Sequence, residues 1–114
     1  MEVSMILFPF IKFYTDGTEV MYSEIIKQDG IDYVRVYFKR WNTERNEFDS
    51  MECLLPDGNM EKIIGFSDME ADYHHSRMIS LQDMILECSQ EDTEKNQTNG
   101  SRKENLKDIR KRSG

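Results

Sequence analysis

The sequence contains few of the residues that cross-link small proteins through disulfides or metal ions. Its 114 residues include two cysteines and two histidines. Two thiols cannot build the disulfide framework of a small secreted domain, so a reducing compartment, the cytoplasm, is expected. The histidines, His74 and His75, are adjacent, and neighbouring side chains on a helix point about 100° apart, so they do not converge on one metal ion. We therefore expect no metal site and no cofactor.

Glycine-rich phosphate loops and long apolar runs are also missing. The longest apolar run, residues 5–11, is far shorter than the roughly 20 residues that a membrane-spanning helix needs. Both cysteines, Cys53 and Cys88, lie among apolar residues, where a thiol is a poor nucleophile. The sequence therefore predicts a non-enzymatic protein with no catalytic residues and no membrane association.

Charge is unevenly distributed along the chain. Residues 1–90 hold 17 Asp and Glu against eight Lys and Arg, whereas residues 91–114 hold five acids and seven bases. This second segment has only two large apolar residues, Leu106 and Ile109, too few to form a core. We expect an acidic domain over residues 1–90 and a flexible charged tail over residues 91–114, with a transient helix over residues 103–112.

Alternating apolar and polar residues predict a series of short strands. Four segments show this period of two or are rich in β-branched and aromatic residues, and Asp-Gly pairs follow several of them. Short sequential connections favour an antiparallel meander. A further segment, residues 59–66, is interpreted either as a fifth strand or as a connector. The four segments expected to be strands are residues 6–14, 19–27, 31–41 and 47–55.

A helix is predicted over residues 67–90. Ser67 and Glu70 have the spacing of a capping box, in which each side chain bonds a free backbone N–H of the first turn. A second capping signal favours an alternative, two short helices broken near residues 79–80, but we expect one helix. An apolar stripe at helical spacing should cover one face of the sheet, giving an α+β fold. The stripe consists of Met69, Tyr73, Leu81, Met84, Ile85 and Cys88.

The segment 31–41 is the expected central strand and holds the candidate binding site. Val34, Val36 and Phe38 share the face that should line the core. The opposite face alternates aromatic and cationic side chains, a composition that is enriched at protein–protein contacts and also suits stacked bases and phosphates. We expect a protein partner here, because an acidic body disfavours nucleic acid. The candidate partner-binding residues are Tyr33, Arg35, Tyr37, Lys39 and Trp41.

The same surfaces are also compatible with other functions. Loops or the tail could simply cover the aromatic face, or a homodimer could bury it. A nucleic-acid binder would use Arg35, Lys39, Arg40 and the basic tail. Carboxylates around the third hairpin and the helix start could instead imitate phosphate and inhibit a nucleic-acid enzyme. Those carboxylates belong to Glu44, Glu47, Asp49, Glu52, Glu61, Asp68, Glu70 and Asp72.

Overall fold

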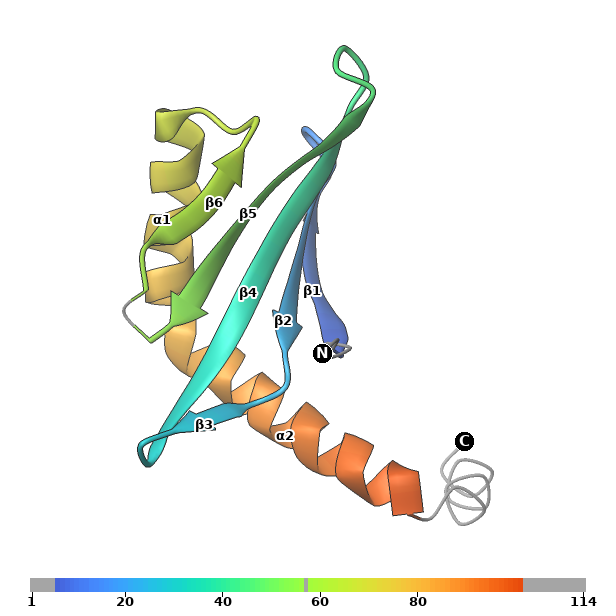
Figure 1. Cartoon of the computed structure of the whole chain (residues 1–114), viewed down its shortest axis with the longest axis vertical. Helices are drawn as coiled ribbons and strands as arrows, with labels where there is room; N and C mark the ends of the chain where they lie inside the picture. The colour runs from blue at the N-terminus through green and yellow to red at the C-terminus, as the bar shows by residue number, and fades with distance from the viewer. Residues whose placement is uncertain (1–5, 57, 102–114) are drawn as a thin grey trace.

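Six strands are followed along the chain by two helices (Figure 1). The computed structural model describes residues 6–56 and 58–101, with side chains as far as residue 95. The strands are β1 (Leu7–Phe13), β2 (Thr18–Ser23), β3 (Ile26–Gln28), β4 (Ile31–Asn42), β5 (Glu47–Leu55) and β6 (Met60–Ile64), and the helices are α1 (Asp68–Ser80) and α2 (Gln82–Ser101).

The strands form one antiparallel sheet in the order β1-β2-β4-β5-β6, so the predicted α+β meander is confirmed. The ambiguous segment 59–66 contains the strand β6, at the edge beside β5. The expected strand 19–27 is divided, because β2 pairs with the middle of β4 and β3 with its beginning. Between them, the Ile25 N–H donates to Thr93 Oγ1 at 2.9 Å instead of joining a ladder.

Both helices cover the same face of the sheet, and in Figure 1 they lie behind the strands. We call this covered face the inner face and the opposite one the outer face. Val34, Val36 and Phe38 lie on the inner face and are buried, as predicted. They pack with Met78 of α1 and Ile85 of α2, so one core joins the two layers. In the described part of the chain, no helix is both long and apolar enough to span a bilayer.

The capping box at the start of α1 is present as predicted. Ser67 Oγ accepts from the Glu70 N–H at 3.1 Å, and the Glu70 carboxylate accepts from the Ser67 N–H at 2.9 Å. The expectation of one continuous helix was wrong, because α1 ends at Ser80 and α2 begins at Gln82. The break at Leu81 lets α1 lie beside β6 while α2 crosses behind β4 and β2.

The apolar stripe expected to face the sheet was wrong in its α1 part, whereas further along the chain Ile85 is buried in the core and Leu81 and Cys88 pack against it. Met69 and Tyr73 are 80% and 53% exposed, whereas Ala71 and His74 are buried. Contacts of His74 with the rings of Phe13 and Phe38, together with an ion pair between Glu70 and Arg40, hold the helix face of positions 70, 74 and 78 against the sheet.

The polar segment after residue 90 begins as part of the folded domain. Helix α2 continues to Ser101, and two of its side chains bind β2 and the residues that follow it. The Tyr22 hydroxyl donates to Asp92, and Thr93 accepts from Ile25. The expected domain boundary at residue 90 therefore falls inside α2. The helix expected over residues 103–112 lies outside the described residues.

Candidate protein-binding face

The alternation of β4 places the predicted binding residues on the outer face, where neither helix packs. Tyr33, Arg35, Tyr37 and Lys39 are partly buried, and Trp41 is 50% exposed. The structure therefore brings together, along one strand, all five side chains that the sequence singled out. Their separation of two residues sets successive side chains about 7 Å apart along the strand.

An aromatic pair forms one end of this face. Trp41 and Phe48 are cross-strand partners, and their ring centroids lie 5.0 Å apart in an edge-to-face arrangement. Phe48 is 49% exposed, and the Lys39 ammonium lies 4.9 Å above its ring. Phe48 was not among the predicted site residues. It lies three positions before the inner-face residue Met51, so the alternation of the strand already places it on the outer face. Recognising the pair also required the β4–β5 register.

Charged side chains occupy the middle of the outer face. Glu52 accepts from Arg35 at 3.2 Å and lies 3.7 Å from the Lys62 ammonium. Burial raises the pKa of the Tyr37 hydroxyl, and the negative charge of Glu52 adds to the rise. A hollow of about 410 Å³ adjoins these groups. Its lining includes Leu7, Met21, Tyr37, Lys39, Ser50, Glu52, Lys62 and Ile64.

Lys39 differs from the other cations of this face. It is the cross-strand partner of Glu19, but the Glu19 carboxylate lies 3.9 Å from Lys12. Within the part of the chain that the structure describes, Lys39 forms no ion pair. Its charge is therefore held next to the Phe48 ring and remains available to an external carboxylate.

Arg40 lies on the inner face, away from Arg35 and Lys39. Its guanidinium contacts Asp49 at 2.7 Å and Glu70 at 2.8 Å, and it stacks 4.2 Å from the centroid of the Phe66 ring. These hydrogen bonds, led by the one to Glu70, raise the pKa of Arg40. The three cations considered for nucleic acid are thus not on one surface, and Arg40 is committed to internal carboxylates.

Several carboxylates considered as phosphate mimics are also used internally. Asp49 is 1% exposed. Burial alone would raise the pKa of its carboxyl, but hydrogen bonds from Arg45, Arg40 and Asn42 hold the pKa below its usual value. Hydrogen bonds from Arg40 and from the Ser67 backbone likewise lower the pKa of Glu70.

The histidines and cysteines do not assemble a reactive centre in the described residues. His74 is buried against the rings of Phe13, Phe38 and other aromatic residues. Burial lowers the pKa of its imidazole. Burial also raises the pKa of the Cys53 thiol to about 11, which leaves the protonated form dominant at neutral pH. No cluster of three metal-ligating side chains occurs among these residues.

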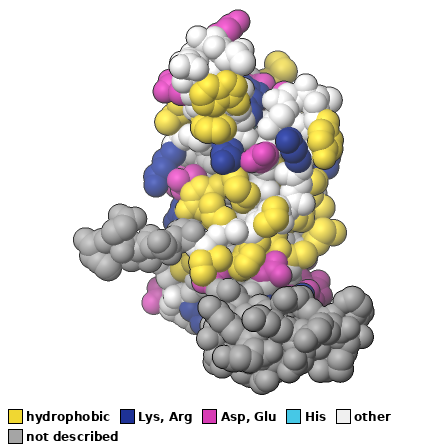
Figure 2. Space-filling model, turned by 90° about the vertical axis from the view of Figure 1, so that its right-hand side faces the viewer, with side chains coloured by type: hydrophobic (Ala, Val, Ile, Leu, Met, Phe, Trp, Pro, Cys, Tyr) yellow, Lys and Arg dark blue, Asp and Glu magenta, His cyan; other side chains and the backbone are white. Residues whose placement is uncertain are grey.

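Hydrophobic side chains are exposed beyond the β4–β5 pair. Seen from the right-hand side of Figure 1, where β1 forms the edge of the sheet, they gather in the middle of the surface, with charged side chains between them (Figure 2). Leu7 of β1 and Ile64 of β6 are among the exposed apolar residues and both line the hollow of the outer face. The apolar character of the face thus extends to both edge strands.

Comparisons with known proteins add no family to this description. No protein-family model, no curated protein and no solved structure matches the chain.

Proposed function

We propose that the protein is a non-enzymatic binding module whose outer sheet face binds a partner protein. The observation that carries the proposal is the placement of both helices on the inner face, which leaves the aromatic and cationic strip of β4 without a covering layer in the described structure. A sheet face with an exposed Trp and partly exposed Tyr and Arg side chains has the composition of interaction hot spots. Such a module would act by covering its partner, as an inhibitor or accessory protein does.

The charge on this face favours a particular kind of partner surface. Arg35 already has Glu52 as a partner, whereas Lys39 has no carboxylate among the described residues. The complementary surface is therefore apolar, with a carboxylate opposite Lys39 and a recess for the Trp41–Phe48 pair. Burying Lys39 without such a carboxylate would cost free energy, so a partner that lacks one would be rejected.

Alanine substitution at Trp41 tests the proposal directly. The protein, its Trp41→Ala variant and a control Met84→Ala variant would each be used to retain proteins from a lysate of the source cells. Met84 is 51% exposed and lies on α2, in the helical layer that covers the inner face. We expect one defined protein to be retained by the wild type and the control. Loss of a hot-spot Trp should weaken the purified complex by about 30-fold or more.

A second variant tests the charge of the partner surface. Lys39→Glu should weaken the same purified complex, and a Lys substitution of the facing carboxylate should restore it. Retention that is equal for Trp41→Ala and wild type would contradict the proposal. So would a large loss of thermal stability in Trp41→Ala, because it would make Trp41 a core residue. Light scattering that shows a homodimer occluding Trp41 would assign the face to self-association instead.

A further inference from the structure

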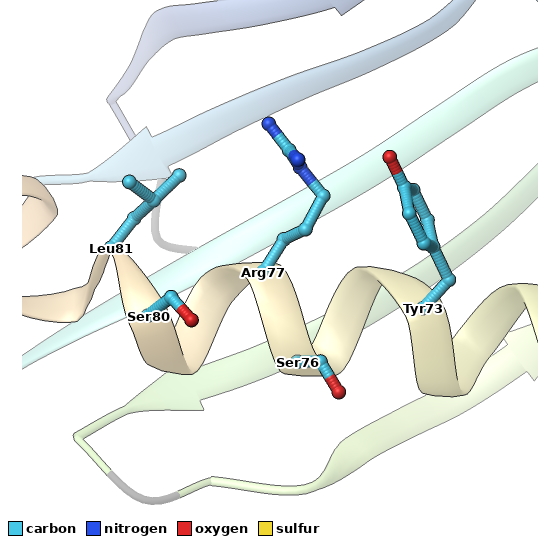
Figure 3. A pocket seen from close by; sticks show the side chains of 5 residues that line it. All are labelled: Tyr73, Ser76, Arg77, Ser80 and Leu81. Atoms are coloured by element: carbon cyan, nitrogen blue, oxygen red, sulfur yellow. The ribbon is translucent and has the colours of Figure 1, made fainter.

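A second surface, on the helical side of the molecule, has features of a ligand site. Two hollows meet at Tyr73 of α1. One, of about 280 Å³, is lined by Tyr73, Ser76, Arg77, Ser80 and Leu81 (Figure 3). The other, of about 390 Å³, is lined by Phe13, Thr15, Asp16, Met69, Glu70, Tyr73 and His74. We call the two together the α1–β1 groove, since its walls come mainly from α1, from Phe13 at the end of β1 and from the turn that follows.

Arg77 is the unusual residue of this groove. Its guanidinium carbon lies 5.7 Å from the ring centroids of both Phe13 and Tyr73. Its Nε is buried and has no hydrogen-bond partner. Among the described residues, the Arg77 side chain makes no hydrogen bond and no ion pair, whereas Arg35 and Arg40 each bind a carboxylate. In a chain with 22 Asp and Glu, an arginine held away from every described carboxylate calls for a physical explanation.

The internal contacts of Arg77 stabilise its positive charge but give its side-chain N–H groups no hydrogen-bond acceptor. The two rings attract the cation, and its place in the last turn of α1 suits the negative end of the helix dipole. Neither contact supplies an acceptor to the buried Nε–H, and a donor that stays without one is costly to bury. A planar guanidinium with free N–H groups matches the two oxygens of a carboxylate or phosphate.

The two ends of the groove differ in charge. Asp16 and Glu70 lie at the end away from Arg77, and both already bind Arg40. Their negative charges repel an anion from that end, so the cationic end is the favourable one. Between the ends lie Tyr73, Met69 and Phe13, which offer an apolar wall. Figure 3 shows Tyr73 and Arg77 projecting from the same side of α1, so one ligand can touch both.

We infer that the α1–β1 groove binds an organic anion that carries a carboxylate or phosphate group on an apolar body. The anionic group is bound by the Arg77 guanidinium, and the apolar body lies across Tyr73 toward Phe13. This site is separate from the outer face and does not depend on the proposed protein partner.

Two probes that share a ring and differ in the anion test this inference. Phenyl phosphate and phenylacetate would be titrated into the ¹⁵N-labelled full chain, with benzyl alcohol as the uncharged control. The signal to follow is the Arg77 Nε–H cross-peak in NMR spectra. We expect it to shift with at least one anion and not with benzyl alcohol. A shift with both anions means that either group is accepted, and a shift with one identifies that group.

Variants separate a specific site from general attraction to cations. Arg77→Gln should weaken probe binding by at least about tenfold, because it removes the charged donor. Arg77→Lys keeps the charge but loses the fork of donors, so it should restore only part of the affinity. Lys27→Gln, at an exposed cation of β3, should leave binding unchanged, as should Trp41→Ala on the outer face.

Three results would overturn the inference. They are an Arg77 signal that does not move with either anion, an equal response to benzyl alcohol, and unchanged binding in a folded Arg77→Gln variant. The first two are measured on the wild-type protein, so they decide the matter even where Arg77→Gln does not fold. Failure here leaves the Trp41 test unaffected, because the two sites lie on opposite faces of the sheet.

Discussion

Arg40 and Asp49 face each other across the β4–β5 pair, with Arg40 Nε 2.7 Å from Asp49 Oδ2 on the inner face. The same guanidinium binds Glu70 in the first turn of α1 and the Gly65 carbonyl at 3.1 Å. One arginine therefore joins two strands, the connection that follows β6 and the start of the helix. The Asp49 carboxylate is nearly inaccessible to water, so its charge depends on this pairing.

Replacing Arg40 should be among the more destabilising changes in the chain. In Arg40→Met, Asp49 keeps Arg45 and Asn42 but loses one cation, and α1 loses its tie to the sheet. We expect the free energy of unfolding to fall by about 3 kcal/mol, the usual cost of breaking a buried pair. Urea denaturation followed by circular dichroism measures it.

The matched control is Lys27→Met, which breaks an exposed ion pair. Lys27 lies 2.7 Å from Asp32, but their side chains are 72% and 41% exposed. Water screens such pairs, so the change should cost less than about 1 kcal/mol. Equal losses for the two variants would show that the Arg40 network contributes no more than a surface pair.

Gly65 is the glycine that this network requires. It has a φ of +84°, and a Cβ at this position would lie 1.9 Å from Asp49 Oδ1. Gly17 has a similar φ of +78° but has no atom within 4 Å of its Cβ position. Gly17→Ala should therefore cost about 1 kcal/mol, from backbone strain alone. Gly65→Ala should cost about 2 kcal/mol more, because Asp49 must also move. Similar unfolding midpoints for the two variants would contradict this account.

The sheet could be predicted from the sequence because its determinants are local. Alternation in β4 sets which side chains are inside, and Asp-Gly turns such as Asp16-Gly17 set where strands reverse. These signals predicted the meander, the burial of Val34 and the position of Trp41 on the outer face. The capping box of α1 is also a local signal, because its two residues, Ser67 and Glu70, lie within four positions of sequence.

The helix register and the α1–β1 groove could not be predicted in this way because they depend on distant contacts. Hydropathy favours Met69 over His74 for burial, yet contacts with distant residues hold His74 against the sheet, among them its packing on Phe38 and the ion pair between Glu70 and Arg40, thirty positions away. The surroundings of Arg77 follow from that rotation. In the sequence, Arg77 simply lies between Tyr73 and Leu81 of the predicted apolar stripe.

The part of α2 that directly follows residue 90 should stabilise the domain. The Tyr22 hydroxyl donates to Asp92, and burial together with this hydrogen bond raises the pKa of Tyr22. Asp92→Ala should lower the free energy of unfolding by about 1 kcal/mol or more, since it removes a hydrogen bond to a charged acceptor. Glu91→Ala is the control, because Glu91 is an exposed neighbour on the same helix.

A double-mutant cycle assigns this loss to the Tyr22–Asp92 contact. Tyr22→Phe removes only the donor, so its cost and that of Asp92→Ala should overlap rather than add. Additive losses would mean that Asp92 acts through some other interaction. No loss in either variant would support the expected domain boundary at residue 90.

His74 should make the fold sensitive to mild acid. It packs among Phe13, Phe38, Phe66 and Tyr73, and burial holds the pKa of its imidazole below the usual 6.5. Asp16 and Glu70 oppose this shift, while Arg40 and Arg77 reinforce it. As the pH falls below 6.5, the unfolded chain takes up a proton at this position before the folded protein does. The free energy of unfolding should therefore decrease below pH 6.5, by at most about 1.4 kcal/mol per pH unit.

The carboxylates that pair with Arg40 act in a lower pH range. The pKa values of Asp16, Asp49 and Glu70 are depressed in the folded protein, so their contribution is present above their unfolded values of about 4 and is lost only in stronger acid. The slope between pH 6.5 and 5 thus reports on His74.

His74→Phe keeps an aromatic ring in the cluster and should flatten that slope, as measured by urea unfolding at a series of pH values. His75→Gln should retain the slope, because His75 bonds the Gly58 carbonyl outside the cluster. A slope that persists in His74→Phe and disappears in His75→Gln would assign the effect to the neighbouring histidine, and it would contradict the conclusion that burial of His74 among aromatic rings makes the fold sensitive to protons.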